Sequence, residues 1–326
     1  MLFRSAEAGG RLIFIGSAPY KSTGLKNYRE NDATVKQTME KIKQEYPASC
    51  AEVRAPENNL INWFGEVQKQ FGITPPVAIE PPDPNISQVQ YTYGEQEIFF
   101  FTNSNIKETF TFRATFNTSG KTPWIWDAET GERYLYPIDE QKNKLTIELA
   151  PAESKLIVFD IKSDGKPMPV NHPDNASAIN LKGPWNVRLN HVDGSRKNKT
   201  LEKLVDFKKD PELKTFAGET IYTNTINLNS GESYAYLDLG EVHGVSEVSV
   251  NDNKLGFKWY GKHLYELKDS LEEGNNTIEI KITTVLGNYC KSLKNNEIAQ
   301  RWTRNQPYAS MGLIGPVKLL KISQKV

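Results

Sequence analysis

The chain has 326 residues, a length that predicts two or three domains rather than one. Its 40 basic and 40 acidic residues give a formal net charge of zero, and the absence of a basic stripe or tail argues against nucleic acid and anionic membranes as partners. No apolar run approaches a membrane span, and the two cysteines, Cys50 and Cys290, lie far apart in unlike contexts, which argues against a disulfide or a metal cluster.

Residues 1–73 predict part of an α/β domain. The run Leu12–Ile15 is continuously apolar between glycines, which is typical of a parallel strand buried on both faces. A helix is expected to start at Asp32, a good N-cap residue, and a second to end at Gly72, with the short strand CAEVRA between them. Two strands and two helices are too few to cover such a strand, so we hypothesise that this domain is incomplete and that the gene begins upstream.

Residues 74–163 predict a small antiparallel β-sandwich. The proline-rich segment 74–85 is expected to be a linker or an extended crossing segment. Beyond it the hydrophobic period becomes two, and short turns separate the strand-like stretches VQYTY, EIFFFTN, TFTFRATF, WIWDAETGERYLY, LTIEL and SKLIVFDI.

The stretch WIWDAETGERYLY predicts a hairpin rich in aromatic residues. Trp124 and Trp126 should share one face of its first strand, and Tyr134 and Tyr136 one face of its second. Asp127 can cap the turn, and Gly131 suits a left-handed position in the turn. Aromatic pairs across such a ladder stabilise it by roughly 0.2–1 kcal/mol each, so we expect this hairpin to serve packing ahead of sugar binding.

Residues 170–326 predict a third, all-β unit, separated from the second by the polar segment SDGKPMPVNHPDNAS. Its cleanest strand carries Ile278, Ile280 and Ile282 in alternation with charged residues, which is typical of a half-buried strand. Asn251–Gly256 predicts a tight turn. Residues 287–312 form a long loop with aromatic and cationic residues, a composition that is more often functional than average. The expected strands lie in LKGPWNVRL, GETIYTNTINL, SYAYLDLGEV, VSEVSVND and NTIEIKITT.

Several of these stretches resemble parts of one enzyme family. The series YLDLGEV, VSVNDNKLG, LEEGNNTIEI and MGLIGPVKL, opened by GPWNVRL and FAGETIYTNTINL, is similar to the galactose-binding-like jelly-roll sandwich of large glycoside hydrolases. EIFFFTNSN, WIWDAETGE and LAPAESKLIVFD resemble the module that precedes it in α-L-rhamnosidase-like glycoside hydrolases of family 106. AGGRLIFIG resembles the glutamine-amidotransferase-like α/β module before that.

The resemblance covers nearly the whole chain in the same order. It implies a mostly β multidomain fold, with a partial α/β remnant at 1–73, a small antiparallel β-sandwich at 74–163 and a galactose-binding-like jelly-roll at 170–326. In such enzymes the catalytic carboxylates lie on a barrel upstream of these modules, and no position of this sequence matches them. The resemblance also implies a secreted or periplasmic location, although this sequence carries no signal peptide.

No catalytic, metal or cofactor site is expected within the chain itself. The acids of the hairpin turn, Asp127, Glu129 and Glu132, are interpreted as solvated turn residues, because nothing near them promises the burial that a general acid needs. GSAP after the first strand lacks the glycines and the lysine of a phosphate loop. The histidines, His172, His191, His243 and His263, have no ligand partner at close helical spacing. Ser17, Ser154 and Ser310 lack the GxSxG pattern of a nucleophile elbow.

Carbohydrate recognition uses aromatic faces together with amide, carboxylate or guanidinium groups. On that basis the candidate glycan-binding residues are Trp259, Tyr260, His263, Asn288, Arg301, Trp302 and Tyr308. The alternatives are that Trp259 and Trp302 cover the ends of the sandwich, or that the long loop packs on the missing barrel.

The sequence therefore leads to one main hypothesis and two alternatives. The main hypothesis is a non-catalytic C-terminal accessory fragment of a glycoside hydrolase, which supports the catalytic barrel and binds glycan. The second is a free-standing carbohydrate-binding protein. The third is an active enzyme assembled with a separate barrel chain.

Overall fold

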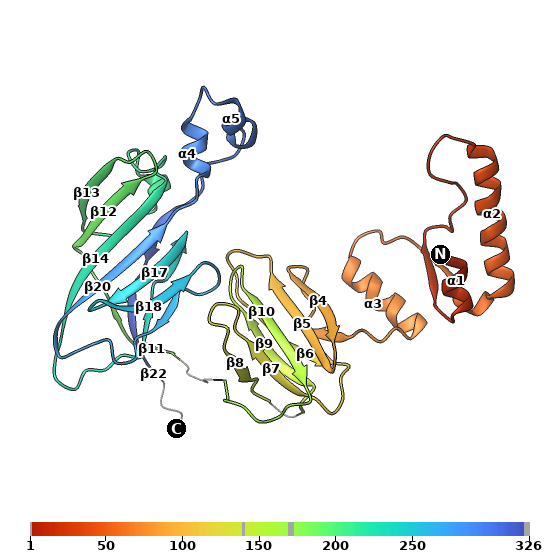
Figure 1. Ribbon diagram of the computed structural model, residues 1–326, viewed down its shortest axis with the longest axis horizontal. Coiled ribbons are helices and arrows are strands. Elements are labelled where there is room, and N and C mark those ends of the chain that lie inside the picture. The colour runs from red at the N-terminus through yellow and green to blue at the C-terminus, as the bar shows by residue number, and fades with distance from the viewer. Residues whose placement is uncertain (1, 139–140, 169–172, 323–326) are drawn as a thin grey trace. The chain divides into compact units, whose positions relative to one another are not determined.

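The computed structural model describes residues 2–138, 141–168 and 173–322, with only the backbone described for 173–176. The fold is mostly β, with several sheets, as the sequence predicts (Figure 1). The chain divides into two compact units, residues 1–75 and 76–326.

The first unit combines helices with a two-stranded parallel sheet, β1 beside β2. Its elements are α1 (Leu2–Glu7), β1 (Leu12–Ile15), α2 (Tyr28–Glu45), the short 3₁₀ helix η1 (Pro47–Ser49), β2 (Cys50–Val53) and α3 (Leu60–Phe71). Its small core consists of Ala6, Leu12, Phe14, Met39 and Ile42.

Only one face of β1 is covered. Leu12 and Phe14 point into the core that α2 contributes to, whereas Ile15 is 57% exposed. The expectation that this strand is buried on both faces is therefore wrong for the described residues, because its two-stranded sheet has no second layer over Ile15.

The first long helix begins earlier than the sequence suggests. It starts at Tyr28, so the expected N-cap, Asp32, lies inside the helix. Its carboxylate instead accepts hydrogen bonds from the Ser22 amide (2.7 Å) and hydroxyl (2.9 Å) of the preceding loop, which hold its pKa below the usual value. The end of α3 follows the prediction: Gly72 adopts a left-handed conformation and terminates the helix.

Residues 76–168 form the small sandwich from a five-stranded sheet, in the order β4-β5-β10-β7-β8, and a three-stranded sheet, β3-β6-β9. The strands are β3 (Val77–Glu80), β4 (Ile86–Tyr93), β5 (Gln96–Asn103), β6 (Phe110–Phe116), β7 (Thr122–Trp126), β8 (Arg133–Leu135), β9 (Lys144–Leu149) and β10 (Ser154–Asp160). The proline-rich segment thus contributes a strand, β3, which pairs with β6. Between the sheets lie the rings of Phe99, Phe101, Phe112, Phe116 and Phe159, several of them in edge-on contact.

The aromatic hairpin forms as β7 and β8, but its aromatic residues do not pair across the ladder. Trp124 lies opposite Leu135, and Trp126 opposite Arg133. Tyr134 lies opposite the buried Ile125, on the core face of the sheet, so the tryptophans and tyrosines occupy opposite faces. The expected aromatic cross-strand pairs are therefore wrong, because one residue of register moves every side chain to the other face.

The tryptophans of the hairpin are held by contacts within the chain. The indole nitrogen of Trp124 donates a hydrogen bond to the Lys162 carbonyl (3.1 Å), and its ring lies where a side chain on Gly165 would clash. The Arg133 guanidinium lies 4.2 Å from the centroid of the Trp126 ring. As predicted, Asp127 caps the turn and Gly131 has a positive φ.

The C-terminal sandwich has a six-stranded sheet, in the order β13-β12-β14-β20-β17-β18, and a four-stranded sheet, β11-β22-β15-β19. A further short pair, β16 with β21, lies beside them. The strands are β11 (Pro173–Asn180), β12 (Trp185–His191), β13 (Arg196–Leu201), β14 (Gly218–Leu228), β15 (Tyr236–Asp238), β16 (Glu241–His243), β17 (Val245–Val250), β18 (Asn253–Lys258), β19 (Leu264–Glu266), β20 (Gly274–Thr283), β21 (Gly312–Gly315) and β22 (Lys318–Ile322), with η2 (Phe207–Lys209) and the helices α4 (Gly287–Ser292) and α5 (Glu297–Thr303).

The inner faces of these sheets form the largest core of the chain. Ile278, Ile280 and Ile282 are fully buried on β20, which confirms the half-buried strand inferred from their alternation. The predicted turn is found but is shorter than Asn251–Gly256: Asn251 and Asp252, both with positive φ, join β17 to β18, which already starts at Asn253.

The sequence pattern does not predict two strands and two helices of this unit. The polar segment expected to separate two domains contains β11, and β13, with the sequence RKNKTL, carries no apolar alternation. The long loop contains α4 and α5. The domain boundaries at 73, 163 and 170 stay a prediction, and residue 170 lies outside the described residues.

Candidate functional site

The excursion between β20 and β21 is an ordered pair of short helices, α4 and α5. The Gln300 side chain of α5 donates hydrogen bonds to carbonyl oxygens at the end of α4, those of Lys291 (3.2 Å) and Leu293 (3.0 Å). The Lys291 ammonium of α4 donates in turn to carbonyl oxygens at the end of α5, those of Arg304 (2.8 Å) and Gln306 (2.6 Å). Each helix thus satisfies the free carbonyl groups of the other, which fixes the pair as a unit.

Two of the predicted glycan-binding residues hold the base of this excursion. Asn288 is buried, and its side-chain amide exchanges hydrogen bonds of 2.8 and 2.9 Å with the backbone of Ala309. The Lys291 and Lys214 ammonium groups lie 5.5 Å and 5.7 Å from the centroid of the Tyr308 ring. The side-chain amide of Asn288 and the ring of Tyr308 are thus already engaged within the chain.

The other two predicted residues of the excursion are exposed. Trp302 is 74% exposed and Ile298, one helical turn earlier, is 75% exposed, so α5 presents an apolar stripe to solvent. Arg301 is exposed beside it. A rigid helix that displays an indole ring is a suitable platform for the apolar face of a sugar ring or for another protein surface.

The second predicted group lies on the loop between β18 and β19. Trp259 is 62% exposed, and its ring meets the Tyr260 ring edge-on at 4.8 Å between centroids. The Tyr260 hydroxyl forms a hydrogen bond with Ser154 of the small sandwich, and burial raises the pKa of Tyr260. This loop therefore makes an internal contact with the small sandwich and leaves Trp259 open to solvent.

Two ion pairs strengthen that contact. The Lys258 ammonium lies 2.8 Å from the Glu129 carboxylate, and the Lys262 ammonium lies 2.8 Å from the Glu148 carboxylate. The first pair is largely shielded from solvent and the second is exposed, so the first should contribute more.

His263 belongs to a buried hydrogen-bond chain. Its Nδ1 lies 2.6 Å from the Ser246 hydroxyl oxygen, which lies 2.6 Å from the Tyr265 hydroxyl. Burial, followed by the nearby charges of Lys258 and His243, lowers the pKa of His263 to about 4. Ser246 is fully buried, so this serine–histidine pair cannot meet a substrate and acts as a packing network.

The structure does not gather the seven predicted residues into one site. Figure 1 shows α4 and α5 beyond one end of the six-stranded sheet, apart from the loop that follows β18. Within the described segments, no hydrogen bond or ring contact joins the two groups.

The acids of the hairpin turn are engaged in structural contacts. The Asp127 carboxylate accepts a hydrogen bond from the Glu129 amide (2.8 Å), Glu129 pairs with Lys258, and Glu132 lies 4.0 Å from the Lys166 ammonium. A second group of acids lines a pocket of about 460 Å³ in the first unit, where Glu52 pairs with Lys43 and Glu57 with Arg54. These five carboxylates therefore have structural partners, which are cations or a turn amide.

The histidines outside the buried chain also have structural partners. His191 meets the rings of Phe216 and Tyr289 edge-on, and His243 lies 2.8 Å from the Glu241 carboxylate. His172 lies outside the described residues. In the described ranges, no group of three or more His, Cys, Asp or Glu side chains lies close enough to hold a metal ion. None of the helices there is long and apolar enough to cross a membrane.

Sequence reasoning missed a polar groove on the outer face of the six-stranded sheet. Its lining residues come from β12, β13 and β14, and β13 carries no hydrophobic signal. Only the alternation in β12, with Trp185, Val187 and Leu189 inward, could have indicated which side chains face outward.

No family model and no curated protein sequence matches this chain. Among solved structures, a rhamnosidase from Novosphingobium sp. PP1Y aligns with 98% of the chain at 21% identity and a TM-score of 0.64. The chain spans about a third of that protein, 31% of its length. A β-D-glucuronidase and a β-D-mannosidase from Dictyoglomus thermophilum align with 34% and 46% of the chain, at 22% and 16% identity, covering 21% and 23% of their own lengths. Their TM-scores, 0.28 and 0.32, are too low to support an argument. The alignment with the rhamnosidase shows that the chain has a glycoside hydrolase-like fold.

Proposed function

We propose that this chain is a non-catalytic accessory region of an α-L-rhamnosidase-like glycoside hydrolase of the family 106 type. The alignment of nearly the whole chain with about a third of a rhamnosidase supports the proposal. In this role the sandwiches brace a catalytic domain that lies elsewhere, and the enzyme hydrolyses a terminal glycosidic bond of a polysaccharide in a secreted or periplasmic setting.

The carboxylates support the non-catalytic part of the proposal. A glycosidase needs two carboxyl groups flanking one bond, roughly 5–10 Å apart, with one of them protonated. The acids of the hairpin turn, together with Glu52 and Glu57 of the first-unit pocket, instead contact cations or turn amides. We expect the purified chain to release no leaving group from an aryl α-L-rhamnoside. Release that is abolished by an acid-to-amide substitution in the chain, such as Glu129→Gln, would refute the proposal.

A glycan-binding role is the second candidate, and the exposed indole of Trp302 favours it. An indole presented by a rigid helix pair provides the aromatic face that a sugar ring stacks on. Calorimetry with a panel of plant and microbial oligosaccharides should detect binding that Trp302→Ala weakens by about tenfold. Trp259→Ala tests the second exposed tryptophan, and Tyr93→Ala, which alters a comparably exposed aromatic residue of the small sandwich, is the control. If calorimetry detects no binding heat with any glycan, support of the catalytic domain remains as the proposed role.

A separate barrel chain is the remaining partner to test. Coexpression with the product of the neighbouring upstream reading frame should yield a complex with rhamnosidase activity if the catalytic domain is encoded separately. An in-frame continuation that encodes a barrel would place both parts on one polypeptide.

A further inference from the structure

The outer face of the six-stranded sheet carries an ordered array of polar side chains. On β12, Trp185, Val187 and Leu189 point into the core, so Asn186 and Arg188 point outward. The register with both neighbouring strands then defines two rows across β13, β12 and β14. The first row is Thr200, Asn186 and Thr223, and the second is Asn198, Arg188 and Ile221.

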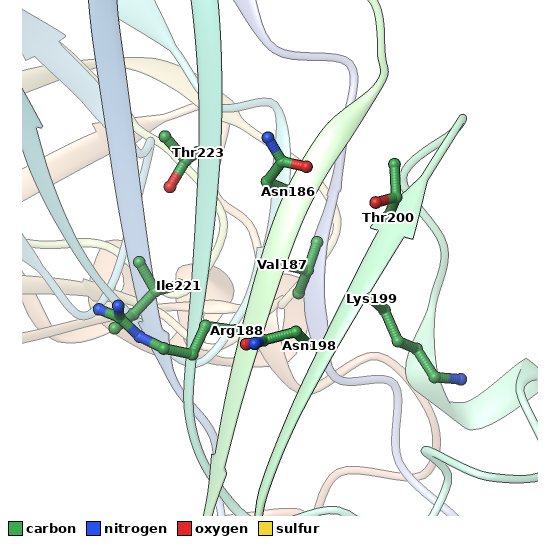
Figure 2. A pocket seen from close by; sticks show the side chains of 8 residues that line it. All are labelled: Asn186, Val187, Arg188, Asn198, Lys199, Thr200, Ile221 and Thr223. Atoms are coloured by element: carbon green, nitrogen blue, oxygen red, sulfur yellow. The ribbon is translucent and has the colours of Figure 1, made fainter.

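These rows line an open groove of about 450 Å³ (Figure 2). Figure 2 shows the Arg188 side chain extending toward Ile221, its cross-strand neighbour, which provides a mostly buried apolar floor. Three neighbouring strands span about 10 Å, the length of about two sugar rings. The volume falls in the range of ligand pockets.

Five polar side chains of the groove have no side-chain partner in the described residues. For Asn186, Arg188, Asn198, Thr200 and Thr223, the described part of the chain provides no side-chain hydrogen bond and no ion pair. Their donors and acceptors are all available to a ligand.

Two lysines of this sheet are paired with carboxylates. Lys281 on β20 pairs with Glu219 and Glu247, and Lys199 on β13 pairs with Glu212. Arg188 has no ion pair in the described residues, and its cross-strand neighbours are an amide and an isoleucine. Opposite charges on neighbouring strands stabilise a solvated sheet face, and the row of Asn198, Arg188 and Ile221 contains no such pair.

We propose that this groove binds an oligosaccharide that contains a uronic acid. The planar guanidinium of Arg188 offers two parallel N–H groups that match a carboxylate. Asn186, Asn198 and the two threonines offer donors and acceptors to ring hydroxyls, and Ile221 meets a C–H face. This site is separate from Trp302, and its test does not depend on the catalytic-domain proposal.

The test measures binding of the full chain to an oligogalacturonide, to a neutral oligosaccharide of equal length and to a sulfated one. The oligogalacturonide should bind most tightly and shift the side-chain amide NMR signals of Asn186 and Asn198. Arg188→Gln should weaken binding by tenfold or more, whereas Arg188→Lys, which keeps the charge but loses the paired geometry, should weaken it less. Arg113→Gln is the matched control, since Arg113 is exposed on β6 of the small sandwich and has no ion pair in the described residues.

Three outcomes would overturn the proposal. One is that the parent chain does not bind the oligogalacturonide at millimolar concentration. Equal thermal unfolding of Arg188→Gln and the parent chain is the accompanying check that both proteins are folded. Another is equal affinity for the neutral or the sulfated oligosaccharide, which would remove the role of the carboxylate. The third is an unchanged affinity in Arg188→Gln, or displacement of the oligogalacturonide by a single-stranded RNA that binds Arg188 more tightly.

Discussion

Acidification should destabilise the C-terminal sandwich through His263. The side chain is buried beside Ser246, and the charges of Lys258 and His243 face it, so the folded state holds it neutral with a pKa of about 4. In the unfolded chain the same imidazole has its ordinary pKa of 6.5. The unfolded state therefore binds one more proton between these two values, and the free energy of unfolding falls as the pH falls through this window.

The difference between the two pKa values sets the size of the effect. At about 1.4 kcal/mol per pH unit, the change from 6.5 to about 4 corresponds to on the order of 3 kcal/mol. This contribution is fully present above about pH 6.5 and is lost by about pH 4. Carboxylates with lowered pKa values, such as those of Asp160 and Asp206, add their own loss at lower pH, so a variant must isolate the histidine.

His263→Asn is the variant of choice, because an amide can replace Nδ1 as the partner of Ser246 but does not titrate here. Urea unfolding is followed by tryptophan fluorescence, to which the buried Trp185 contributes, at several pH values between 7.5 and 4.5, and gives the stability of both proteins. The parent should lose about 2.5 kcal/mol more than the variant over this range. An NMR titration that places the imidazole pKa near 6.5, or a stability difference between the two proteins that stays constant with pH, would refute the reasoning.

Four further substitutions test the packing of the sandwiches by chemical unfolding. Lys258→Met should lower the free energy of unfolding by about 1–3 kcal/mol, because it leaves a shielded carboxylate unpaired. Lys262→Met, at an equally short but exposed ion pair, should lower it by less than about 1 kcal/mol. Equal losses would contradict the role of shielding. Gly218→Ala should cost more than about 1 kcal/mol, since φ is +146° and a Cβ would collide with the Asn190 carbonyl, and a neutral effect would argue against that backbone geometry. Ile280→Ala should cost about 2–5 kcal/mol through the cavity it leaves, and a loss below about 1 kcal/mol would indicate a loosely packed core.

Much of the β architecture is visible in local sequence. Ile278, Ile280 and Ile282 alternate with charged residues, and all three are buried in the structure. The turn at Asn251 and Asp252 follows from residues that tolerate positive φ. These features depend on neighbours within a few residues, so the sequence alone indicates them.

Short helices and polar strands escape this kind of reasoning. The helices α4 and α5 have six and seven residues, too short to be stable by themselves. They exist because Lys291 and Gln300 reach across to cap the opposite helix. Strand β13 forms because β12 provides its hydrogen-bond partners, although its own residues are polar.

Register is the feature that only the tertiary structure decided. The sequence placed Trp124 and Trp126 on one face of a strand, but the pairing with β8 set Leu135 and Arg133 opposite them. The two rows around Arg188 likewise depend on how three strands align. Alternation within a strand is a local property, whereas the residue opposite on the next strand is fixed by the packing of the whole sheet against its core.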